Sequence, residues 1–172
     1  MKKIIVLFIL VFNLLEAHPH IFFEVDSQLI VKKENKIYIN MKFILDEMNS
    51  LLISEKLNCD YLYEDINKDL KIFYNGKLLN NNIISKEINY KDENVVIDIV
   101  IEEQLSLKDK DKLVISVYDE NYFYDYDYNK DNLKIENEIR YEIEYKFREN
   151  KEKAYYFNMI YPREFEVNFY EK

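Results

Sequence analysis

The sequence predicts a mainly β protein, with β-sandwich-like antiparallel sheets and one or two short helices after the second strand. Three observations predict this class. Short segments alternate apolar and polar residues with a period of two, turn-forming residues separate them, and one segment alone shows helical spacing. No repeat, low-complexity tract or linker divides the chain. We therefore expect a signal peptide at 1–17, followed by a single β-rich domain at 18–172.

The first two strands are predicted at 21–31 and 37–45, where apolar side chains occupy every second position. Residues 33–35 form a plausible turn between them, so the two strands are expected to pair as an antiparallel hairpin. Paired residues in such a hairpin have numbers that add up to about 67–69. This register predicts that His20 lies beside Asp46, at one end of one sheet.

The period changes after the second strand. Asp46 is a suitable helix N-cap, and Met48, Leu51 and Leu52 follow at helical spacing through about Leu57. Asn75-Gly76 has the composition of a tight hairpin turn. Further strands are predicted at 70–74, 77–79, 83–90, 95–103, 112–118, 122–128, 139–147, 155–160 and 165–170.

The first residues have the composition of a secretory signal peptide. Lys2 and Lys3 precede an apolar run at 4–12 that is short for a membrane-spanning helix, and Ala17 is the small residue expected before a cleavage site. An uncleaved N-terminal anchor is the alternative. No cysteine stands at the cut, so no lipid anchor is expected. Cleavage after Ala17 predicts a periplasmic protein that begins His-Pro-His.

Composition excludes several classes of function. The net charge is −9 and becomes more negative by one when the signal peptide is lost, so nucleic acid and anionic membranes should repel the chain. A single glycine excludes glycine-rich phosphate loops. Cys59 is the one cysteine, which excludes an internal disulfide and indicates a buried apolar residue. No serine or cysteine lies in the sequence context of a nucleophile with a histidine, so we do not expect an enzyme.

His18 and His20 are the two histidines of the chain, and both fall at the predicted mature N-terminus. Together with the α-amine they form a ligand set that suits zinc, nickel, cobalt or copper and is poor for magnesium. Pro19 has no amide N–H, which excludes a copper site built from successive deprotonated amides. The alternative is a solvated N-terminal arm that binds no metal.

Carboxylates are expected at the same end of the sheet. Asp46 is the predicted third metal ligand, after His18 and His20. Glu47 and Asp119 are predicted as alternates or as groups that support the ligands, because Asp119 ends a convincing strand. The expected cofactor is therefore one divalent transition metal ion.

Two acidic segments invite a calcium interpretation. Residues 118–131 contain five acidic residues among tyrosines, and alternation puts Tyr122, Tyr124, Tyr126 and Tyr128 on one face; a polar edge strand is the favoured interpretation. Residues 65–72 match half of an EF-hand loop. Their pattern lacks the glycine and the final glutamate, so a surface turn is predicted.

Four segments resemble an uncharacterised family of small exported bacterial proteins described as the periplasmic component of an ABC-type transport system. They are AHPHIFFEVD at 17–26, FILDEMNSLL at 43–52, NGK at 75–77 and VISVYDENYF at 114–123. The resemblance extends from residue 17 to about residue 130. The family often occurs beside nickel/cobalt or zinc permeases, so the resemblance implies transition-metal handling.

Three hypotheses follow. The first is a periplasmic accessory protein that binds a divalent transition metal and assists a membrane metal permease or ABC-type transporter. The second is a metal-free β-sandwich adaptor that docks on a membrane transport system through the acidic and aromatic face at 122–128. The third is a copper oxidase that holds its metal with the amine and imidazole of His18.

Overall fold

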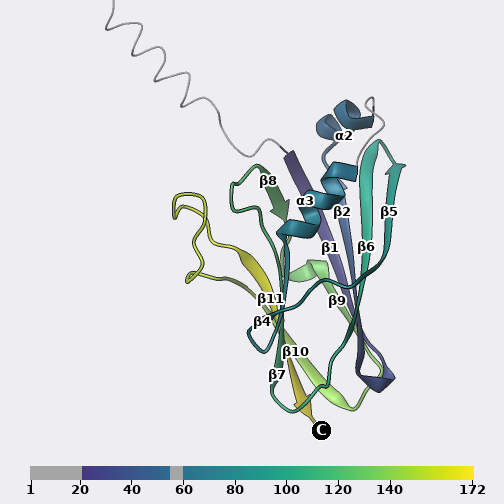
Figure 1. Cartoon of the computed structure of the whole chain (residues 1–172), viewed down its shortest axis with the longest axis vertical. Helices are drawn as coiled ribbons and strands as arrows, with labels where there is room; N and C mark the ends of the chain where they lie inside the picture. Colours follow the sequence, from purple (N-terminus) through teal and green to yellow (C-terminus); the bar gives the residue numbers. More distant parts are fainter. Residues whose placement is uncertain (1–20, 55–59) are drawn as a thin grey trace, which may run out of the picture.

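Two β-sheets face each other around one hydrophobic core in the computed structural model, which describes residues 21–54 and 60–172 (Figure 1). The first sheet contains, in spatial order, β5 (Ile83–Lys91), β6 (Asn94–Gln104), β2 (Lys36–Leu45), β1 (Ile21–Val31) and β8 (Tyr124–Asp127), and β9 (Leu133–Asn137) also pairs with β1. The second contains β10 (Tyr141–Glu149), β11 (Arg163–Glu171), β7 (Asp111–Val117), β3 (Leu70–Tyr74) and β4 (Lys77–Leu78). The predicted mainly β, sandwich-like class is confirmed.

β1 and β2 form the predicted antiparallel hairpin. Their inward side chains alternate with exposed or half-buried ones along both strands, because successive residues of a strand point to opposite faces. The short helix η1 (Lys33–Asn35) makes the turn, with Glu34 at a φ of 69°. Phe23 lies opposite Leu45, so the paired numbers add up within the predicted range and the register is confirmed.

The other edge of β1 is covered by two consecutive strands that run parallel to it. Ile21 lies opposite Tyr124 in β8, and Ser27 lies opposite Leu133 in β9. The short helix η2 (Lys130–Asn132) separates these strands. The parallel pairing differs from the antiparallel sheets expected, because the chain crosses from β7 in the second sheet to β8 in the first. β9 was not predicted.

Two helices follow β2. α2 (Glu47–Ser54) begins directly after Asp46, as predicted. α3 (Asp60–Asp69) is the second of the one or two short helices predicted after the second strand, although no residue range was predicted for it. It buries Leu62 and Ile66 in the common core near the same end of the molecule (Figure 1). Their spacing of four residues puts both on one face of the helix. The surface turn predicted for 65–72 is therefore wrong, because this segment is the end of α3 and the start of β3.

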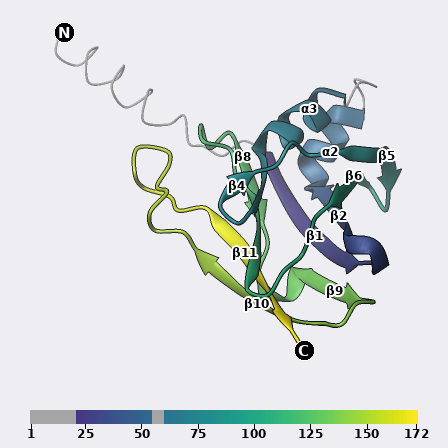
Figure 2. The same cartoon turned by 60° about the horizontal axis from the view of Figure 1, so that its bottom comes forward.

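The turn predicted at residues 75–76 is present, whereas the strand predicted at 155–160 is not. Asn75 and Gly76 have φ values of 49° and 80° and join β3 to β4, which confirms the predicted tight turn. The strand predicted at 155–160 is a projecting loop between β10 and β11, with one isolated bridge between Tyr155 and Ile160 (Figures 1 and 2). Its alternating apolar residues are not buried, since Phe157 is 84% exposed.

Candidate functional site

β1 begins between two acidic segments. On one side, the Asp46 N–H donates to the Phe22 carbonyl at 3.1 Å, and the Phe22 N–H donates to Asp46 Oδ2 at 3.4 Å. On the other side, the Ile21 N–H donates to the Phe123 carbonyl at 3.4 Å, in the loop that starts at Asp119. The predicted placement of Asp46 and Asp119 at one end of the first sheet is thus confirmed.

Asp46 caps α2. Its Oδ1 accepts the backbone N–H of Asn49 at 3.0 Å, its Oδ2 accepts the side-chain amide of the same residue at 2.7 Å, and its carbonyl accepts the Ser50 N–H at 2.8 Å. Capping satisfies N–H groups that the first turn of a helix leaves without partners. Some lone pairs of the Asp46 carboxylate are thus already used in these hydrogen bonds, and a metal ion would have to bind through the others.

The start of α2 is fixed to the first sheet. The Ser50 hydroxyl donates to the Leu45 carbonyl at 3.1 Å and accepts the Val95 N–H at 2.9 Å. The Asn94 side chain donates to the same Leu45 carbonyl at 2.7 Å. These contacts tie the end of β2 to the start of β6, so the corner that carries Asp46 is rigidly supported.

Asp119 is buried, and its carboxylate accepts hydrogen bonds from the backbone. Oδ1 accepts the Asn121 N–H at 2.9 Å, and Oδ2 accepts the N–H groups of Phe123 at 2.7 Å and Tyr124 at 3.2 Å. These bonds hold the loop that leads into β8. The structure thus gives Asp119 a supporting role in the fold, and it would act on a metal only indirectly.

The remaining predicted ligands are one exposed carboxylate and the two histidines. Glu47 is the first residue of α2 and is exposed, next to Asp46. His18 and His20 lie outside the described residues, as does Cys59, so the contact between His20 and Asp46 stays a prediction. Across 21–54 and 60–172, no three His, Cys, Asp or Glu side chains are grouped so that they could hold a metal ion.

A second group of carboxylates, which the sequence did not reveal, lies where α3 meets β8. We call Asp65, Asp69, Tyr124 and Tyr126 the acid–tyrosine cluster. The hydroxyl of Tyr124 donates to Asp65 Oδ2 and that of Tyr126 to Asp69 Oδ2, each at 2.7 Å. The two aspartates are one helical turn apart and therefore face the same way.

Burial raises the pKa of Asp69 to about 7. This value is a balance: the hydrogen bond from Tyr126 and the positive charge of Lys71 lower the pKa, whereas the negative charges of Asp119 and Asp65 add to the effect of burial. The pKa of Tyr126 is also raised well above its ordinary value, by burial and by the carboxylate of Asp69. The exposed Lys68 donates to Asp65 Oδ1 at 3.1 Å, whereas the Asp69 carboxylate accepts its hydrogen bond from the neutral hydroxyl of Tyr126.

The tyrosine face predicted at 122–128 is not a surface. Tyr124, Tyr126 and Tyr128 are buried against the core, and the opposite face of β8 carries Asp125 and Asp127. The hydroxyl of Tyr128 also hydrogen-bonds the carbonyl groups of β7 and β11 residues. The prediction of an acidic and aromatic docking face at this strand is therefore wrong, because its aromatic half is internal.

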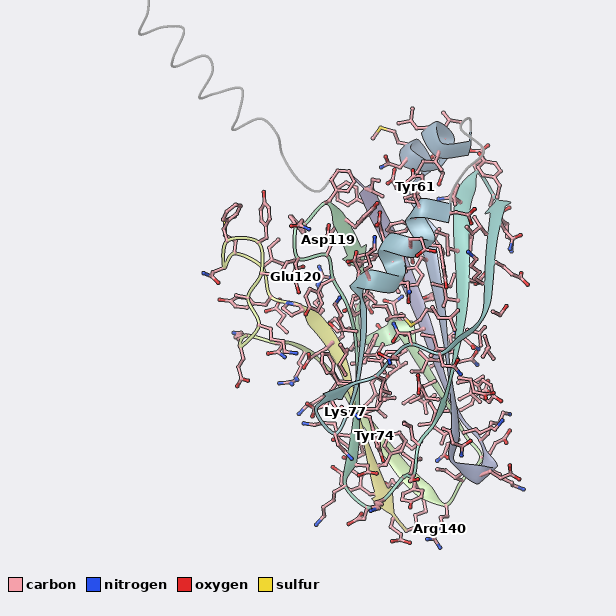
Figure 3. The ribbon with its side chains drawn as sticks, in the orientation of Figure 1. Tyr61, Tyr74, Lys77, Asp119, Glu120 and Arg140 are labelled. Atoms are coloured by element: carbon pink, nitrogen blue, oxygen red, sulfur yellow. The ribbon has the colours of Figure 1, made fainter. Side chains whose placement is uncertain are left out.

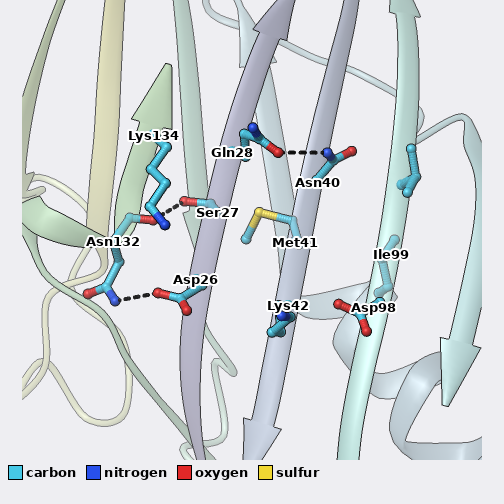
Figure 4. A pocket seen from close by; sticks show the side chains of 11 residues that line it. Asp26, Ser27, Gln28, Asn40, Met41, Lys42, Asp98, Ile99, Asn132 and Lys134 are labelled. Atoms are coloured by element: carbon cyan, nitrogen blue, oxygen red, sulfur yellow. Dashed lines mark hydrogen bonds between the residues drawn. The ribbon is translucent and has the colours of Figure 1, made fainter. Parts of the chain in front are cut away.

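A polar groove of about 400 Å³ lies on the outer face of the first sheet (Figure 4). Its side chains are largely bonded to one another: the Asn132 amide donates to Asp26 Oδ1 at 2.8 Å, and the Asn40 amide donates to Gln28 Oε1 at 3.1 Å. Lysine and aspartate side chains of opposite charge alternate along it. We attribute the groove to the solvated outer face of the first sheet, whose other face packs on the core.

The comparisons with known proteins concern the N-terminal part of the chain. Residues 3–70 match a family described as "Protein of unknown function (DUF1007)". The match covers less than half of the chain and includes β1, β2, α2 and α3. No curated protein matches the chain. In the part of the chain that the structure describes, no helix has both the length and the apolar character needed to cross a membrane.

Proposed function

We propose that the protein is exported to the periplasm through a cleaved signal peptide and has a binding role there, not a catalytic one. It binds one divalent transition metal ion, which is zinc, nickel, cobalt or copper. It assists a membrane metal permease or an ABC-type transporter that takes up or delivers this ion. The proposed ligands are His18, His20 and Asp46, with Glu47 as the alternate carboxylate and Asp119 as support.

One observation supports this site above any other in the molecule. The first described residues of β1 are hydrogen-bonded on one side to Asp46 and on the other to the loop held by Asp119. His20 precedes Ile21 directly, and His18 is two positions earlier. A chain that leaves β1 at this point starts between two carboxylates, and two imidazoles on it complete a set that transition metals prefer.

The α-amine is part of the proposal, because cleavage after Ala17 frees it on His18. Imidazoles with an ordinary pKa near 6.5 and an amine near 7.7 must lose their protons before they coordinate. Binding should therefore weaken steeply below about pH 6. The match at residues 3–70 to a family of unknown function is compatible with any such role and identifies none.

Isothermal titration of the mature protein with Zn²⁺, Ni²⁺ and Cu²⁺ tests the site. We expect one dominant site, a loss of at least about tenfold in affinity for His20→Ala, and a similar loss when Gly-Ser is added before His18. Asp46→Asn is the informative carboxylate variant, because asparagine caps a helix as well as aspartate but is a far weaker metal ligand. Unchanged binding in His20→Ala would end the metal proposal.

Sequencing the N-terminus of the exported protein tests the proposed processing. Cleavage after Ala17 gives His-Pro-His as the first three residues. A chain that still begins at Met1, or one that begins after His20, would remove the free amine of His18 from the ligand set. Asp131→Asn, at an exposed position in η2, serves as the matched control for Asp46→Asn in the titration, because Asp131 is not among the proposed ligands.

A metal-free adaptor remains the second candidate, and one observation favours it. Met48, Leu51 and Leu52 on α2 are 69%, 59% and 55% exposed, and Phe22 is half exposed at the same end of the molecule. Exposed apolar side chains that gather at one place mark contact surfaces. The docking surface of an adaptor would thus be α2 and not residues 122–128.

Complementation separates the two candidates. In a strain that lacks the protein and grows poorly on limiting metal, the accessory role predicts that His20→Ala fails to restore growth. The adaptor role predicts the reverse pattern: His20→Ala restores growth, whereas Leu52→Ser combined with Met48→Ser does not. Both variants must reach wild-type levels in the periplasm for the comparison to count.

A further inference from the structure

A small cavity lined by aromatic rings lies beneath the loop between β10 and β11. It has a volume of about 90 Å³ and is enclosed chiefly by Tyr118, Tyr122, Tyr128 and Tyr155. The ring centroids of Tyr118 and Tyr155 are 5.2 Å apart, and those of Tyr122 and Tyr155 are 6.4 Å apart. Three rings from two separate loops therefore meet at one point.

A wider, open cavity of about 470 Å³ adjoins the small one. The two share the side chains of Tyr118 and Tyr155, and the outer cavity is also lined by one acidic and one basic side chain, Glu120 and Lys153. Figure 3 shows Glu120 on the loop after β7, beside the projecting loop. The inner cavity has room for a compact chemical group, and the open outer cavity has room for the rest of a molecule that carries this group.

The charged side chains that line the inner cavity, Asp125 and Arg163, have different partners. Among the described residues, Arg163 is the one basic side chain that lines the cavity, and its guanidinium donates to Asp127 Oδ1 at 3.0 Å and to the Tyr128 carbonyl at 3.2 Å. Asp125 also lines the cavity and is half-buried, and within the described ranges no hydrogen bond to its carboxylate is present. The guanidinium of Arg163 thus already has two acceptors, whereas the carboxylate of Asp125 has no donor among the described residues.

The electrostatics of Asp125 agree with this geometry. Burial raises its pKa above the ordinary value, the charge of Arg163 lowers it by less, and the charge of Asp127 raises it again. The same carboxylate contributes to the raised pKa values of Tyr122 and Tyr155, after burial. A positive charge in the cavity would relieve this unfavourable burial.

The loops around the cavity hold bulky residues in a strained backbone conformation. Tyr122 has a φ of 55° and Tyr156 a φ of 45°, and their rings are 5.3 Å apart. Phe157 and Asn158 continue the run of positive φ values. Non-glycine residues in this region are energetically costly and concentrate at ligand-binding positions. A loop that served only to connect two strands would not need three such residues in succession.

We propose that this tyrosine cavity is a binding site for a small organic ammonium cation, with Tyr118, Tyr122 and Tyr155 as its aromatic walls and Asp125 as its counter-charge. Aromatic faces attract cations, and cages of aromatic rings are the usual receptors for methylated ammonium groups. The inner cavity takes the ammonium head, and the outer cavity beside Glu120 takes the rest of the molecule. This site is independent of the proposed metal site.

Choline is a suitable probe, because it can be compared with a neutral analogue that has carbon in place of the quaternary nitrogen. Titration of the mature protein, followed by proton NMR of the methyl groups, should show choline binding at one site with its methyl signals shifted upfield by the tyrosine rings. The neutral analogue should bind at least about ten times more weakly, since it lacks the charge.

Variants assign the binding to this cavity. Asp125→Asn and Tyr155→Leu should each weaken choline binding about tenfold, whereas Tyr155→Phe, which keeps the ring, should change it less than about threefold. Asp131→Asn and Tyr90→Leu are matched controls at exposed positions and should leave it unchanged. Circular dichroism of each variant checks the fold.

Three outcomes would overturn the proposal. They are no choline binding at millimolar concentration, equal binding of choline and the neutral analogue, and full binding by Asp125→Asn. Binding of phosphate that is lost in Arg163→Gln would show an anion site instead. None of these outcomes bears on His18 or His20, so the metal proposal is tested separately.

Discussion

Glu164 and Glu166 on β11 and Asp69 at the end of α3 are all withdrawn from water, but their carboxylates have different partners. Glu164 and Glu166 are 3% and 5% exposed. Arg148 lies 2.5 Å from Glu164 Oε1 and 3.2 Å from Glu166 Oε2, and Lys146 lies 2.8 Å from Glu166 Oε1. Asp69 is hydrogen-bonded to the neutral hydroxyl of Tyr126.

The pKa values differ accordingly. Burial raises the pKa of Glu166, but the hydrogen bond from Lys146 and the charges of Lys112, Lys146 and Arg148 together bring it below its ordinary value. Burial raises the pKa of Asp69 to about 7, and no cation offsets it fully. Burial alone thus does not decide whether the pKa of a carboxyl group rises or falls. The charge of its partner decides it. On the second sheet, basic side chains balance the charges of Glu164 and Glu166. On α3 and β8, acidic side chains outnumber basic ones.

The largest effect is expected from removing the cation that Glu164 and Glu166 share. Arg148→Met should lower the free energy of unfolding by about 2 kcal/mol, less than the loss of a fully buried pair because Arg148 is itself partly exposed. Arg140→Met is the control, since Arg140 pairs with the exposed Glu171 and should cost under about 0.5 kcal/mol. Urea denaturation measures both. Equal losses would mean that burial of the glutamates does not matter.

A smaller effect of opposite sign is expected at Asp69. Its folded pKa of about 7 is above the ordinary 3.8, so the folded state binds the proton more tightly, and stability falls as the pH rises from about 4 to 7. Asp69→Asn removes this loss. The variant should be more stable than wild type by about 1 kcal/mol at pH 8, a figure reduced for partial exposure, with no gain at pH 4. Thermal unfolding at both pH values checks this, with Asp131→Asn as the control.

The smallest effect is expected at Glu166. Its folded pKa is lowered, so its contribution to stability is present above the ordinary value of 4.5 and is lost as the pH falls through the folded pKa. Glu166→Gln should therefore cost under about 1 kcal/mol at pH 7, and the difference from wild type should vanish in acid. A loss that persists at pH 3 would point to packing instead of charge. Glu142→Gln, on the exposed face of β10, is the control.

The hairpin of β1 and β2 could be predicted because its pattern and its turn are local. The apolar residues at alternate positions show which face of each strand is buried, and a three-residue turn sets the register of the pair. β8 had the same clear alternation and was predicted as a polar edge strand, but the alternation alone did not show which of its two faces is buried. Tyrosine suits either side of a strand, and the aspartates that accept the hydroxyls of Tyr124 and Tyr126 lie 59 and 57 residues away in sequence.

In the candidate site, too, the features set by neighbouring residues could be predicted and those set by loop conformation could not. The N-cap role of Asp46 follows from the residues beside it, and its position at the start of β1 follows from the register. The backbone hydrogen bonds of Asp119 depend on the conformation of its loop, which no residue pattern gives. The tyrosine cavity joins Tyr118 to Tyr155 across two loops, and residues 155–160 carry the alternation of a strand, which hid the loop.

The strand order places the two ends of the described chain at opposite ends of the molecule (Figure 1). β11 finishes at Glu171, beside the start of β7, whereas β1 starts near α2 and β8. An affinity tag or a surface tether attached after Lys172 would therefore sit far from Asp46. Protein immobilised in this way would present the first residues of β1 to the solution, with no extension added on the N-terminal side of β1.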